Sequence, residues 1–287
     1  MRVILVPVAD RPECAVALTR TFDLAADLGA SVVGCHIRPH SYSEVTLPAT
    51  LTDATLGGSD AEWQAAWKPR SRQQTGPAAR TLFTRLAQRK GFDIHKTPRA
   101  KPGAIWMEKT GSPQRVIGII GPLSDLLVVS RPEGKDGSIA RLFLVAALMA
   151  SARPVLVLPQ AGEWSVGKRI CIAWNQSKDA ALAVASALPL LQLAQRVSIV
   201  CSGAENQPGP KSSQLAAYLK AWGIQSERLT TRGNDDNREI LSAFRSTKSD
   251  LLVMGAYSRS RFSQMIFGGV TDYMLNRASI PVLMRHN

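Results

Sequence analysis

A loop near the carboxyl end of the chain carries residue types that can hold phosphate groups. It runs Gly255-Ala256-Tyr257-Ser258-Arg259-Ser260-Arg261, continues through Phe262 to Phe267, and closes with Gly268-Gly269-Val270-Thr271. Glycine lets backbone N–H groups approach an anion closely, and a helix that begins there adds the positive end of its dipole. Arg259 and Arg261 could add positive charge. Many glycine turns bind nothing, so this interpretation depends on the elements around the loop.

An internal repeat places this loop at the end of a strand. The hexapeptide Ser249 to Met254, which leads directly into Gly255, is a close copy of Ser124 to Val129. Each copy is followed by a loop, a helix-compatible stretch and a second short strand, Arg153 to Leu158 in the first half and Ile280 to Met284 in the second. Both halves also begin with an apolar strand and an Ala/Leu-rich helix. Duplication of one unit explains this order.

The expected strands are continuous apolar runs, which is typical of strands covered on both faces. Strands that alternate with helices imply βαβ units and a parallel sheet. We therefore expect an α/β chain of two tandem, doubly wound, Rossmann-like domains, 1–160 and 167–287, each a five-stranded parallel sheet flanked by helices. A short turn-forming linker, Pro159 to Gly167, joins them. The expected strands are 2–8, 31–37, 103–109, 125–130 and 154–158, then 169–174, 196–201, 226–232, 250–255 and 281–285.

Two stretches of the first half are harder to assign. Phe92 to Lys96 competes with Ala104 to Lys109 for the third strand. A longer segment, Tyr42 to Pro77, carries Trp63 and Trp67 four residues apart. That spacing is typical of a buried stripe on a helix, so we interpret the pair as packing residues.

The segment Asp250 to Arg285 resembles the carboxyl-terminal signature of the universal stress protein family, Gly-x2-Gly-x9-Gly-Ser/Thr. Gly255 fits the first glycine of this signature and Gly268 fits the third. Ser258 stands where the second glycine is expected, and Gly269 occupies the Ser/Thr position. The order and spacing of the elements agree with the resemblance at both ends of the chain.

The resemblance extends to the ends of the first strands. Trp174-Asn175-Gln176-Ser177 stands where the family usually has an Asp that contacts the nucleotide, and here Asn175 holds that place. In the first half, Asp10 resembles that acidic residue, although it could equally cap the following turn. The first-half loop Ser130 to Gly137 lacks the first glycine, and Pro132 removes a backbone donor. We interpret the first half as a degenerate copy.

The resemblance implies an adenine-nucleotide-hydrolase-like fold whose members either bind ATP or do not, and an internal pseudo-dimer of the two halves. One hypothesis is a nucleotide-responsive stress regulator whose second half binds ATP or another adenine nucleotide, with Mg²⁺. The alternative is a scaffold that binds no nucleotide and acts through protein contacts. The site expected in the second half comprises Asn175, Gly255, Ser258, Arg259, Arg261, Gly268, Gly269, Val270 and Thr271, and Asp10 is its first-half counterpart.

The composition narrows the choice of partners. The formal net charge is +13, and the run from Lys68 to Arg115 has 12 basic but only two acidic residues. Few aromatic side chains interleave with this run, so we do not expect nucleic acid as a partner. No apolar run approaches the roughly 20 residues that span a bilayer. We expect a cytoplasmic protein with protein partners or a homo-oligomeric state.

The motifs of enzymes are absent or incomplete. Gly162-x4-Gly167-Lys168 imitates a P-loop, but Arg169 replaces the Ser/Thr and a strand rather than a helix follows. His36 and His40 straddle a strand end, so no helical face joins them as metal ligands. The four cysteines are widely spaced, as expected of reduced thiols. We expect no catalytic residue, no metal site and at most slow ATP hydrolysis.

Overall fold

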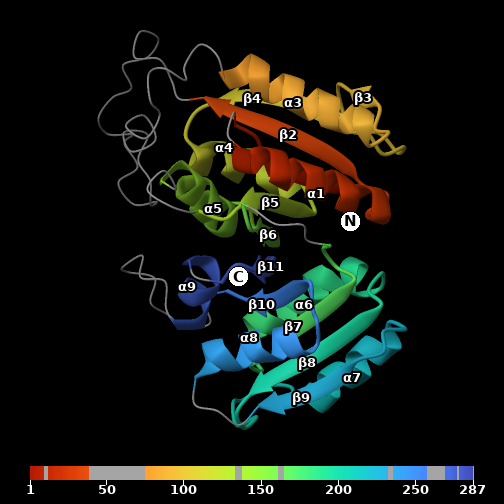
Figure 1. Ribbon diagram of the computed structural model, residues 1–287, viewed down its shortest axis with the longest axis vertical. Coiled ribbons are helices and arrows are strands. Elements are labelled where there is room, and N and C mark those ends of the chain that lie inside the picture. The colour runs from red at the N-terminus through yellow and green to blue at the C-terminus, as the bar shows by residue number, and fades with distance from the viewer. Residues whose placement is uncertain are drawn as a thin grey trace. The chain divides into compact units, whose positions relative to one another are not determined.

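The computed structural model describes residues 1–9, 12–38, 75–132, 138–160, 165–231, 235–256, 269–276 and 278–286. The chain divides into two compact units, Met1–Arg153 and Pro154–Asn287. In each unit, helices cover both faces of a mostly parallel sheet (Figure 1). The α/β class expected from the sequence is therefore confirmed.

In unit 1 the first strand lies inside the sheet. The strand β1 (Val3–Pro7) pairs on one side with β2 (Ser31–Arg38) and on the other with β5 (Leu126–Ser130), all parallel. Beyond β2 the sheet continues with β4 (Ala104–Thr110) and the short edge strand β3 (Ile94–His95), again parallel. Both runs that competed for the third strand thus form strands, and Ala104–Thr110 is the longer one that pairs with β2.

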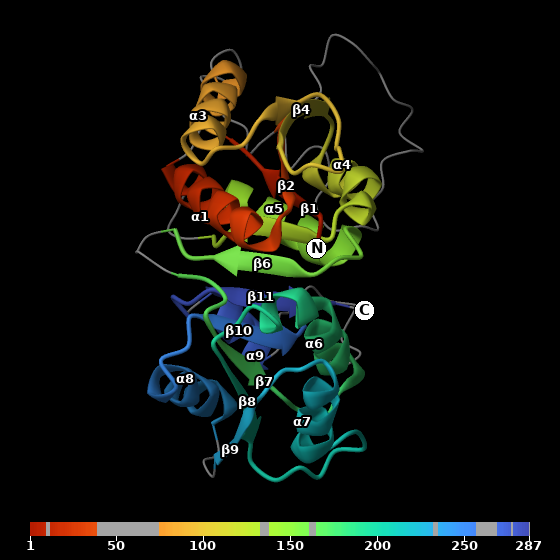
Figure 2. The ribbon, with the colours of Figure 1, turned by 90° about the vertical axis from the view of Figure 1, so that its right-hand side faces the viewer.

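Right-handed crossovers decide which face each helix of unit 1 covers. The chain moves in one direction from β1 through β2 to β4, so α1 (Pro12–Leu28) and α3 (Thr75–Arg89) share a face. It then returns past β1 to β5, which places α4 (Pro113–Ile120), the 3₁₀ turn η3 (Gly121–Leu123) and α5 (Ser138–Ala150) on the other face (Figure 2).

Aromatic rings fill the space between the sheet of unit 1 and α1 and α3. Phe22 is fully buried, and its ring centroid lies 5.4 Å from that of Phe83 and 5.1 Å from that of Phe92. The Phe83 ring rests on the β2 backbone at Gly34, where a Cβ atom would come within 2.6 Å of the ring. A larger residue at this position would displace the ring from the core.

Unit 2 contains all five strands expected of the second half. They are β7 (Arg169–Ala173), β8 (Arg196–Ser202), β9 (Glu227–Thr231), β10 (Leu251–Gly255) and β11 (Val282–Arg285). Their order, β11-β10-β7-β8-β9, places the first strand inside the sheet, as in unit 1, and all four pairings are parallel.

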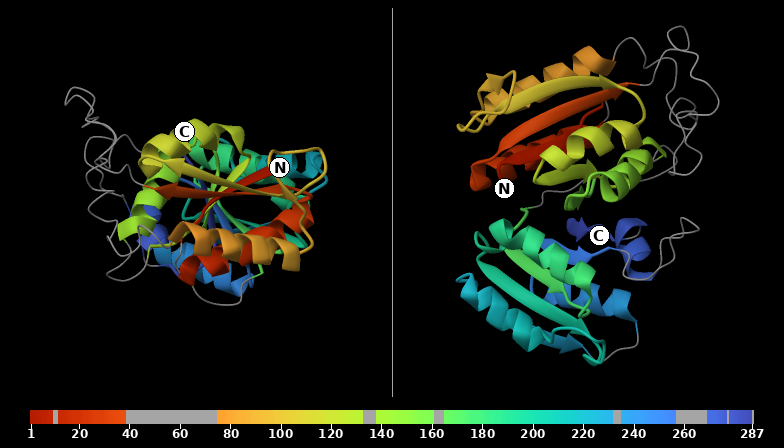
Figure 3. Two further views of the ribbon diagram at one scale, coloured as in Figure 1. Left: turned by 90° about the horizontal axis from the view of Figure 1, so that it is seen from above. Right: turned by 180° about the vertical axis from the view of Figure 1, so that it is seen from behind.

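The helices of unit 2 follow the same rule of handedness. The helices α6 (Lys178–Leu191) and α7 (Ser212–Ala221) belong to the crossovers from β7 to β8 and from β8 to β9 and cover one face (Figure 3, right). The helices α8 (Asp236–Ser246) and α9 (Gly269–Asn276) belong to the return path and contact each other on the opposite face.

The segment 154–158, expected as the fifth strand of the first half, does form a strand, β6 (Val155–Leu158). The compact units divide at Arg153, so β6 is grouped with unit 2. There it pairs antiparallel with β11, a pairing that the sequence interpretation did not include.

The repeated Ser-Asp pair has a structural role that explains the repetition. The carboxylate of Asp250, just before β10, accepts hydrogen bonds from the backbone N–H groups of Gly167, Lys168 and Arg169 at 3.0–3.1 Å and from the Ser165 hydroxyl at 2.7 Å. In unit 1 the carboxylate of Asp125, just before β5, accepts from the N–H groups of Arg2 and Val3 at 2.6 and 3.0 Å. Asp125 thus fastens the start of β1 to the start of β5, and Asp250 fastens the start of β7 to the start of β10.

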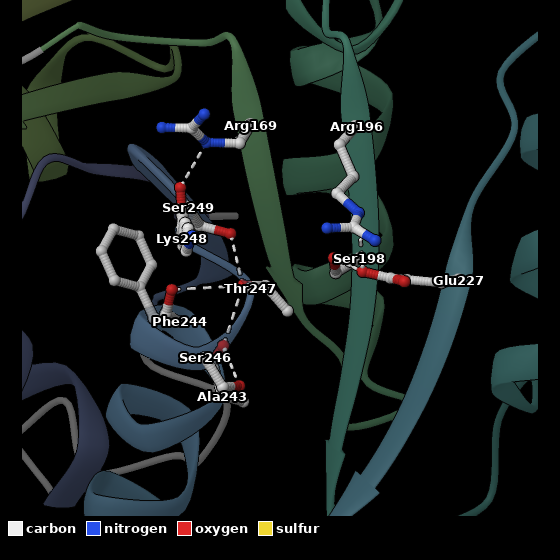
Figure 4. A network of polar contacts seen from close by, with 10 residues as sticks. All are labelled: Arg169, Arg196, Ser198, Glu227, Ala243, Phe244, Ser246, Thr247, Lys248 and Ser249. Carbon is white, nitrogen blue, oxygen red and sulfur yellow. Dashed lines mark hydrogen bonds and ion pairs between the residues drawn. The ribbon is translucent and has the colours of Figure 1, made fainter.

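Further polar contacts reinforce this end of unit 2. The Arg169 Nε donates to the carbonyl of Lys248, a residue with a positive φ of 51° directly after α8 (Figure 4). The Thr247 hydroxyl, at the end of the same helix, lies 2.8 Å from the Ala243 carbonyl oxygen. Between β8 and β9, the Glu227 carboxylate accepts from the Ser198 hydroxyl at 2.7 Å and lies 3.2 Å from the Arg196 Nε. The turn that carries Asp250 into β10 is therefore held by Arg169, and the edge of the sheet is held by Glu227.

Replacing Asp250 with Ala is expected to lower the free energy of unfolding of unit 2 by about 2–4 kcal/mol, because buried N–H groups lose a charged acceptor. Urea titration followed by circular dichroism measures this change. The control is Glu239→Gln on α8, which we expect to change the free energy of unfolding by less than about 0.5 kcal/mol. Equal stability of Asp250→Ala and the control would show that the carboxylate is dispensable.

Asp125 gives the fold a dependence on pH. Burial raises the pKa of its carboxyl group, but the N–H groups of Arg2 and Val3 and the charge of Arg153 outweigh burial and hold the pKa below the ordinary 3.8. A lowered pKa in the folded state means that the stabilisation is fully present above pH 3.8 and is lost as the pH falls through the folded-state pKa.

We therefore expect Asp125→Asn to be less stable than wild type at neutral pH, and the difference to shrink as the pH falls below 3.8. Urea unfolding of both proteins across an acid pH series measures it. A difference that stays constant from neutral pH to about pH 3 would mean that the charge of Asp125 does not contribute.

Candidate functional site

The carboxyl ends of β7 and β10 form the place in unit 2 where the direction of winding reverses. The strand β7 pairs with β10 on one side and with β8 on the other, so the loops that leave β7 and β10 run toward opposite faces of the sheet. Crevices of this kind hold ligands in open α/β sheets. Two residues expected in the site, Asn175 and Gly255, lie at this edge.

Gly255 is packed against the start of α6. A Cβ atom on Gly255 would lie 2.6 Å from the backbone nitrogen of Ala180 and 2.6 Å from the carbonyl carbon of Asp179. Both are backbone atoms of the first turn of the helix, which cannot move without moving the helix. The absence of a side chain at Gly255 therefore serves strand–helix packing, a role that the sequence pattern did not distinguish from phosphate binding.

Asn175 forms a turn that starts α6. Its side-chain oxygen accepts hydrogen bonds from the backbone N–H of Ser177 at 3.2 Å and from the Ser177 hydroxyl at 2.7 Å. The Ser177 hydroxyl oxygen in turn accepts from the N–H of Ala180 at 3.1 Å and caps the helix. Since the amide oxygen is engaged with donors of its own loop, the amide NH₂ of the exposed Asn175 is the group it offers to a ligand.

The loop that follows β8 is bonded to the loop that follows β7. Gln176, buried and with a positive φ of 64°, donates from its side-chain amide to the carbonyls of Gln207 at 2.9 Å and Gly209 at 3.1 Å. Its amide oxygen accepts from the N–H of Gln207 at 3.1 Å, and the indole of Trp174 donates to the Pro210 carbonyl at 2.9 Å. A Cβ atom on Gly209 would lie 2.0 Å from the Gln176 carbonyl oxygen. We call this set of contacts the Gln176 clasp.

The far end of the glycine loop begins α9. Gly269 has a positive φ of 49°, Val270 is half-buried and Thr271 is buried. The remaining expected site residues lie outside the described residues, and so do the tryptophan pair and one histidine of the sequence interpretation: Asp10, His40, Trp63, Trp67, Ser258, Arg259, Arg261 and Gly268. Their roles stay predictions.

One buried acidic residue at this edge was missed by the sequence interpretation. Asp179 is 5% exposed and stands in the first turn of α6. Its Cβ atom lies 2.9 Å from the position that a Gly255 Cβ would occupy. An acidic residue in the first turn of a helix is ordinarily a partner of the helix dipole, so no pattern in the sequence indicated its proximity to Gly255. A carboxylate there can accept hydrogen bonds from hydroxyl groups.

The cysteine and histidine residues do not form a reactive centre in the described part of the chain. All four cysteines are free and buried, and burial raises the pKa of Cys35 and of Cys171 to about 12. Burial and the charge of Glu205 raise the pKa of Cys201 to about 11. These thiols are therefore protonated, hence poor nucleophiles, at neutral pH. No cluster able to hold a metal ion occurs among the described residues.

The described part of the basic run is partly neutralised. The Lys90 ammonium pairs with Asp23, and Lys101 lies 2.9 Å from the carboxylate of Asp93. The lysine of the second pair also lowers the pKa of Asp93. Within the described ranges, none of the helices has the length and apolarity needed to cross a membrane.

Known proteins resemble this chain in one part of its sequence and in its fold. Residues 202–286 match the Universal stress protein family. In fold, the chain is similar to a universal stress protein from Archaeoglobus fulgidus, with a TM-score of 0.66 at 15% identity over 99% of this chain and 96% of that one. It is also similar to a functionally unknown protein from Pseudomonas aeruginosa, with a TM-score of 0.57 at 14% identity over 100% and 92% of the two chains. No curated protein matches the sequence.

The strand order, the helices on both faces and the reversal of winding define a Rossmann-like α/β fold of the doubly wound type. Within that class, residues 202–286 match the model of the universal stress protein family. The resemblance seen in the glycine signature is thus confirmed, and a length of 287 residues fits a tandem arrangement.

We expect Gly255→Ala to destabilise unit 2 by about 1–3 kcal/mol, because the new methyl group collides with the backbone of α6. Thermal unfolding followed by circular dichroism tests this. Gly118→Ala on α4 is the matched control, since its Cβ would lie 3.7 Å from that of Ala150, an ordinary contact. That helical glycine should tolerate alanine or gain stability. Equal effects of the two substitutions would contradict the packing role of Gly255.

Proposed function

We propose that this protein is a nucleotide-responsive stress regulator whose unit 2 binds ATP or another adenine nucleotide. The observation that carries the proposal is the position of Asn175 and Gly255 together at the carboxyl ends of two adjacent parallel strands, where the winding reverses. The phosphates would lie over Gly255 to Arg261 and Gly268 to Thr271, and the Mg²⁺ that accompanies ATP would arrive with the nucleotide.

The hydrogen bonds of Asn175 favour one part of the nucleotide as its contact. Ser177 occupies the amide oxygen through its N–H and its hydroxyl, so Asn175 presents an NH₂ donor. A donor is complementary to the ring nitrogens of adenine, which accept hydrogen bonds. The buried carboxylate of Asp179 is the nearby acceptor and is suited to ribose hydroxyl groups rather than to phosphate, because two anions would repel each other.

A second candidate function is favoured by the Gln176 clasp. The clasp holds the loop after β8 against the loop after β7 through four hydrogen bonds of 2.9–3.1 Å. It therefore occupies part of the edge that a base would approach. A chain whose crevice is closed in this way would act as a scaffold through protein contacts, without a nucleotide.

Calorimetric titration with Mg-ATP separates the two functions. We expect wild type to bind and Gly268→Val to bind at least about tenfold more weakly, because a branched side chain keeps the backbone N–H groups away from phosphate. Gly118→Ala, a glycine substitution in unit 1, is the control and should bind as wild type does. Circular dichroism verifies folding, and native mass spectrometry of the purified protein identifies any nucleotide that it retains.

A second variant tests the orientation of the nucleotide. Asn175→Asp keeps the oxygen that accepts from Ser177 but removes the NH₂ donor, so binding should weaken if Asn175 faces a ring nitrogen. Tighter binding would place a ribose hydroxyl there instead. If folded Gly268→Val binds as tightly as wild type, the site lies elsewhere. If wild type does not bind Mg-ATP at all, the scaffold function takes its place.

A further inference from the structure

A cavity of about 300 Å³ opens at the edge of unit 1 where its strands begin. This is the opposite edge from the one where the fold would place a nucleotide. The cavity is lined by Arg2, Val3, Gly29, Ser31, Pro98, Arg99, Ala100 and Pro102. Its size is at the lower end of the range for sites that hold small organic molecules.

Unit 2 provides an internal comparison that shows how the cavity arises. Gly91 and Gly223 each lie shortly after a helix, and each has a positive φ of 76°. In unit 2 only four positions separate Gly223 from Glu227, the residue that pairs with Ser198 on β8. In unit 1 fourteen positions separate Gly91 from Ile105, the residue that pairs with Val33 on β2. The connection in unit 1 is therefore ten residues longer, and these extra residues supply one wall of the cavity.

Two arginine residues line this space. Arg2 and Arg99 are both exposed, and among the described residues neither side chain forms an ion pair. They differ in this from Lys101 on the same loop, which is paired with Asp93. The carboxylate of Asp125, which lies at this edge, is engaged by the backbone N–H groups of Arg2 and Val3. The cavity is therefore positive in charge.

The uncharged part of the lining offers one further donor and an apolar wall. The hydroxyl oxygen of the buried Ser31 accepts from the N–H of Gly103 at 3.2 Å, which fastens the longer connection to β2 and leaves the hydroxyl proton for another acceptor. The rings of Pro98 and Pro102 and the side chains of Val3 and Ala100 are apolar. At the end of α1, the carbonyl oxygens of Ala25 and Ala26 are already engaged, because they accept hydrogen bonds from the backbone N–H groups of Ala30 and Gly29.

We propose that this cavity binds a small organic anion, with a phosphate or carboxylate head between Arg2 and Arg99 and a small apolar body against Pro98 and Pro102. Guanidinium groups recognise such heads through parallel N–H donors, and Ser31 adds a third contact. The long connection of unit 1 creates this site, and the short connection of unit 2 has no counterpart to it. The site is independent of the nucleotide site in unit 2.

The test is a calorimetric titration of the full chain with phenyl phosphate and with benzoate, carried out at low and at raised salt. Phenol, which has the same ring without the charge, should not bind. We expect Arg99→Gln and Arg2→Gln each to weaken binding of the anionic probes by roughly tenfold. Neither change should disturb folding, because both side chains are exposed and the bonds between Arg2 and Asp125 use the backbone.

Arg85→Gln, on the exposed surface of α3, removes the same charge away from the cavity and should bind as wild type does. Equal weakening by Arg85→Gln and Arg99→Gln would show that only the overall positive charge matters, which would overturn the proposal. Absence of binding of both anionic probes to wild type would overturn it as well. Inorganic phosphate binding as tightly as phenyl phosphate would refute the role of the apolar wall. Gly268→Val should bind the anionic probes as tightly as wild type does. A failure of the cavity in unit 1 to bind anions is therefore distinguishable from a failure of the nucleotide site.

Discussion

A single carboxylate, at the start of β5 in unit 1 and of β10 in unit 2, holds each unit of this protein in register. Adjacent parallel strands are never joined by a tight turn, so nothing local to the chain sets how far one slides along the other. Asp250 and Asp125 solve this by accepting the first backbone N–H groups of β7 and β1. The Ser-Asp-Leu-Leu-Val motif therefore recurs because each copy of the fold needs the same anchor.

The register that this anchor sets decides what happens at the other end of the strands. With β7 and β10 aligned from their starts, Gly255 ends opposite the first turn of α6, where only a glycine fits. The same alignment brings Asn175, Asp179 and the Gln176 clasp to that edge. The arrangement at this edge of unit 2 is thus a consequence of packing between strand and helix, and any ligand has to use the groups that packing leaves available.

The two units share the arrangement of their core and differ outside it. Both have the central strands and the anchoring Asp, because losing either would undo the sheet. Their connections are free to change, since loops lie on the surface and tolerate insertions. In unit 1 the longer connection before β4 builds a basic cavity at the amino ends of the strands, whereas in unit 2 the loop after β8 closes over the carboxyl ends. The two units present different chemistry on one architecture.

The sequence by itself determined the α/β class, the five strands of unit 2 and the place of Gly255 at a strand end, because apolar runs and a repeated motif are local patterns. The sequence could not decide whether Phe92 to Lys96 or Ala104 to Lys109 forms the third strand, and the structure has a strand in both, β3 and β4. Only the tertiary structure decided that β6 pairs antiparallel with β11, that Gly255 accommodates α6, and that Asp179 and the Gln176 clasp lie at the carboxyl ends of β7 and β10. Strand direction and close approach depend on residues far apart in the chain, and no local pattern encodes which of them meet.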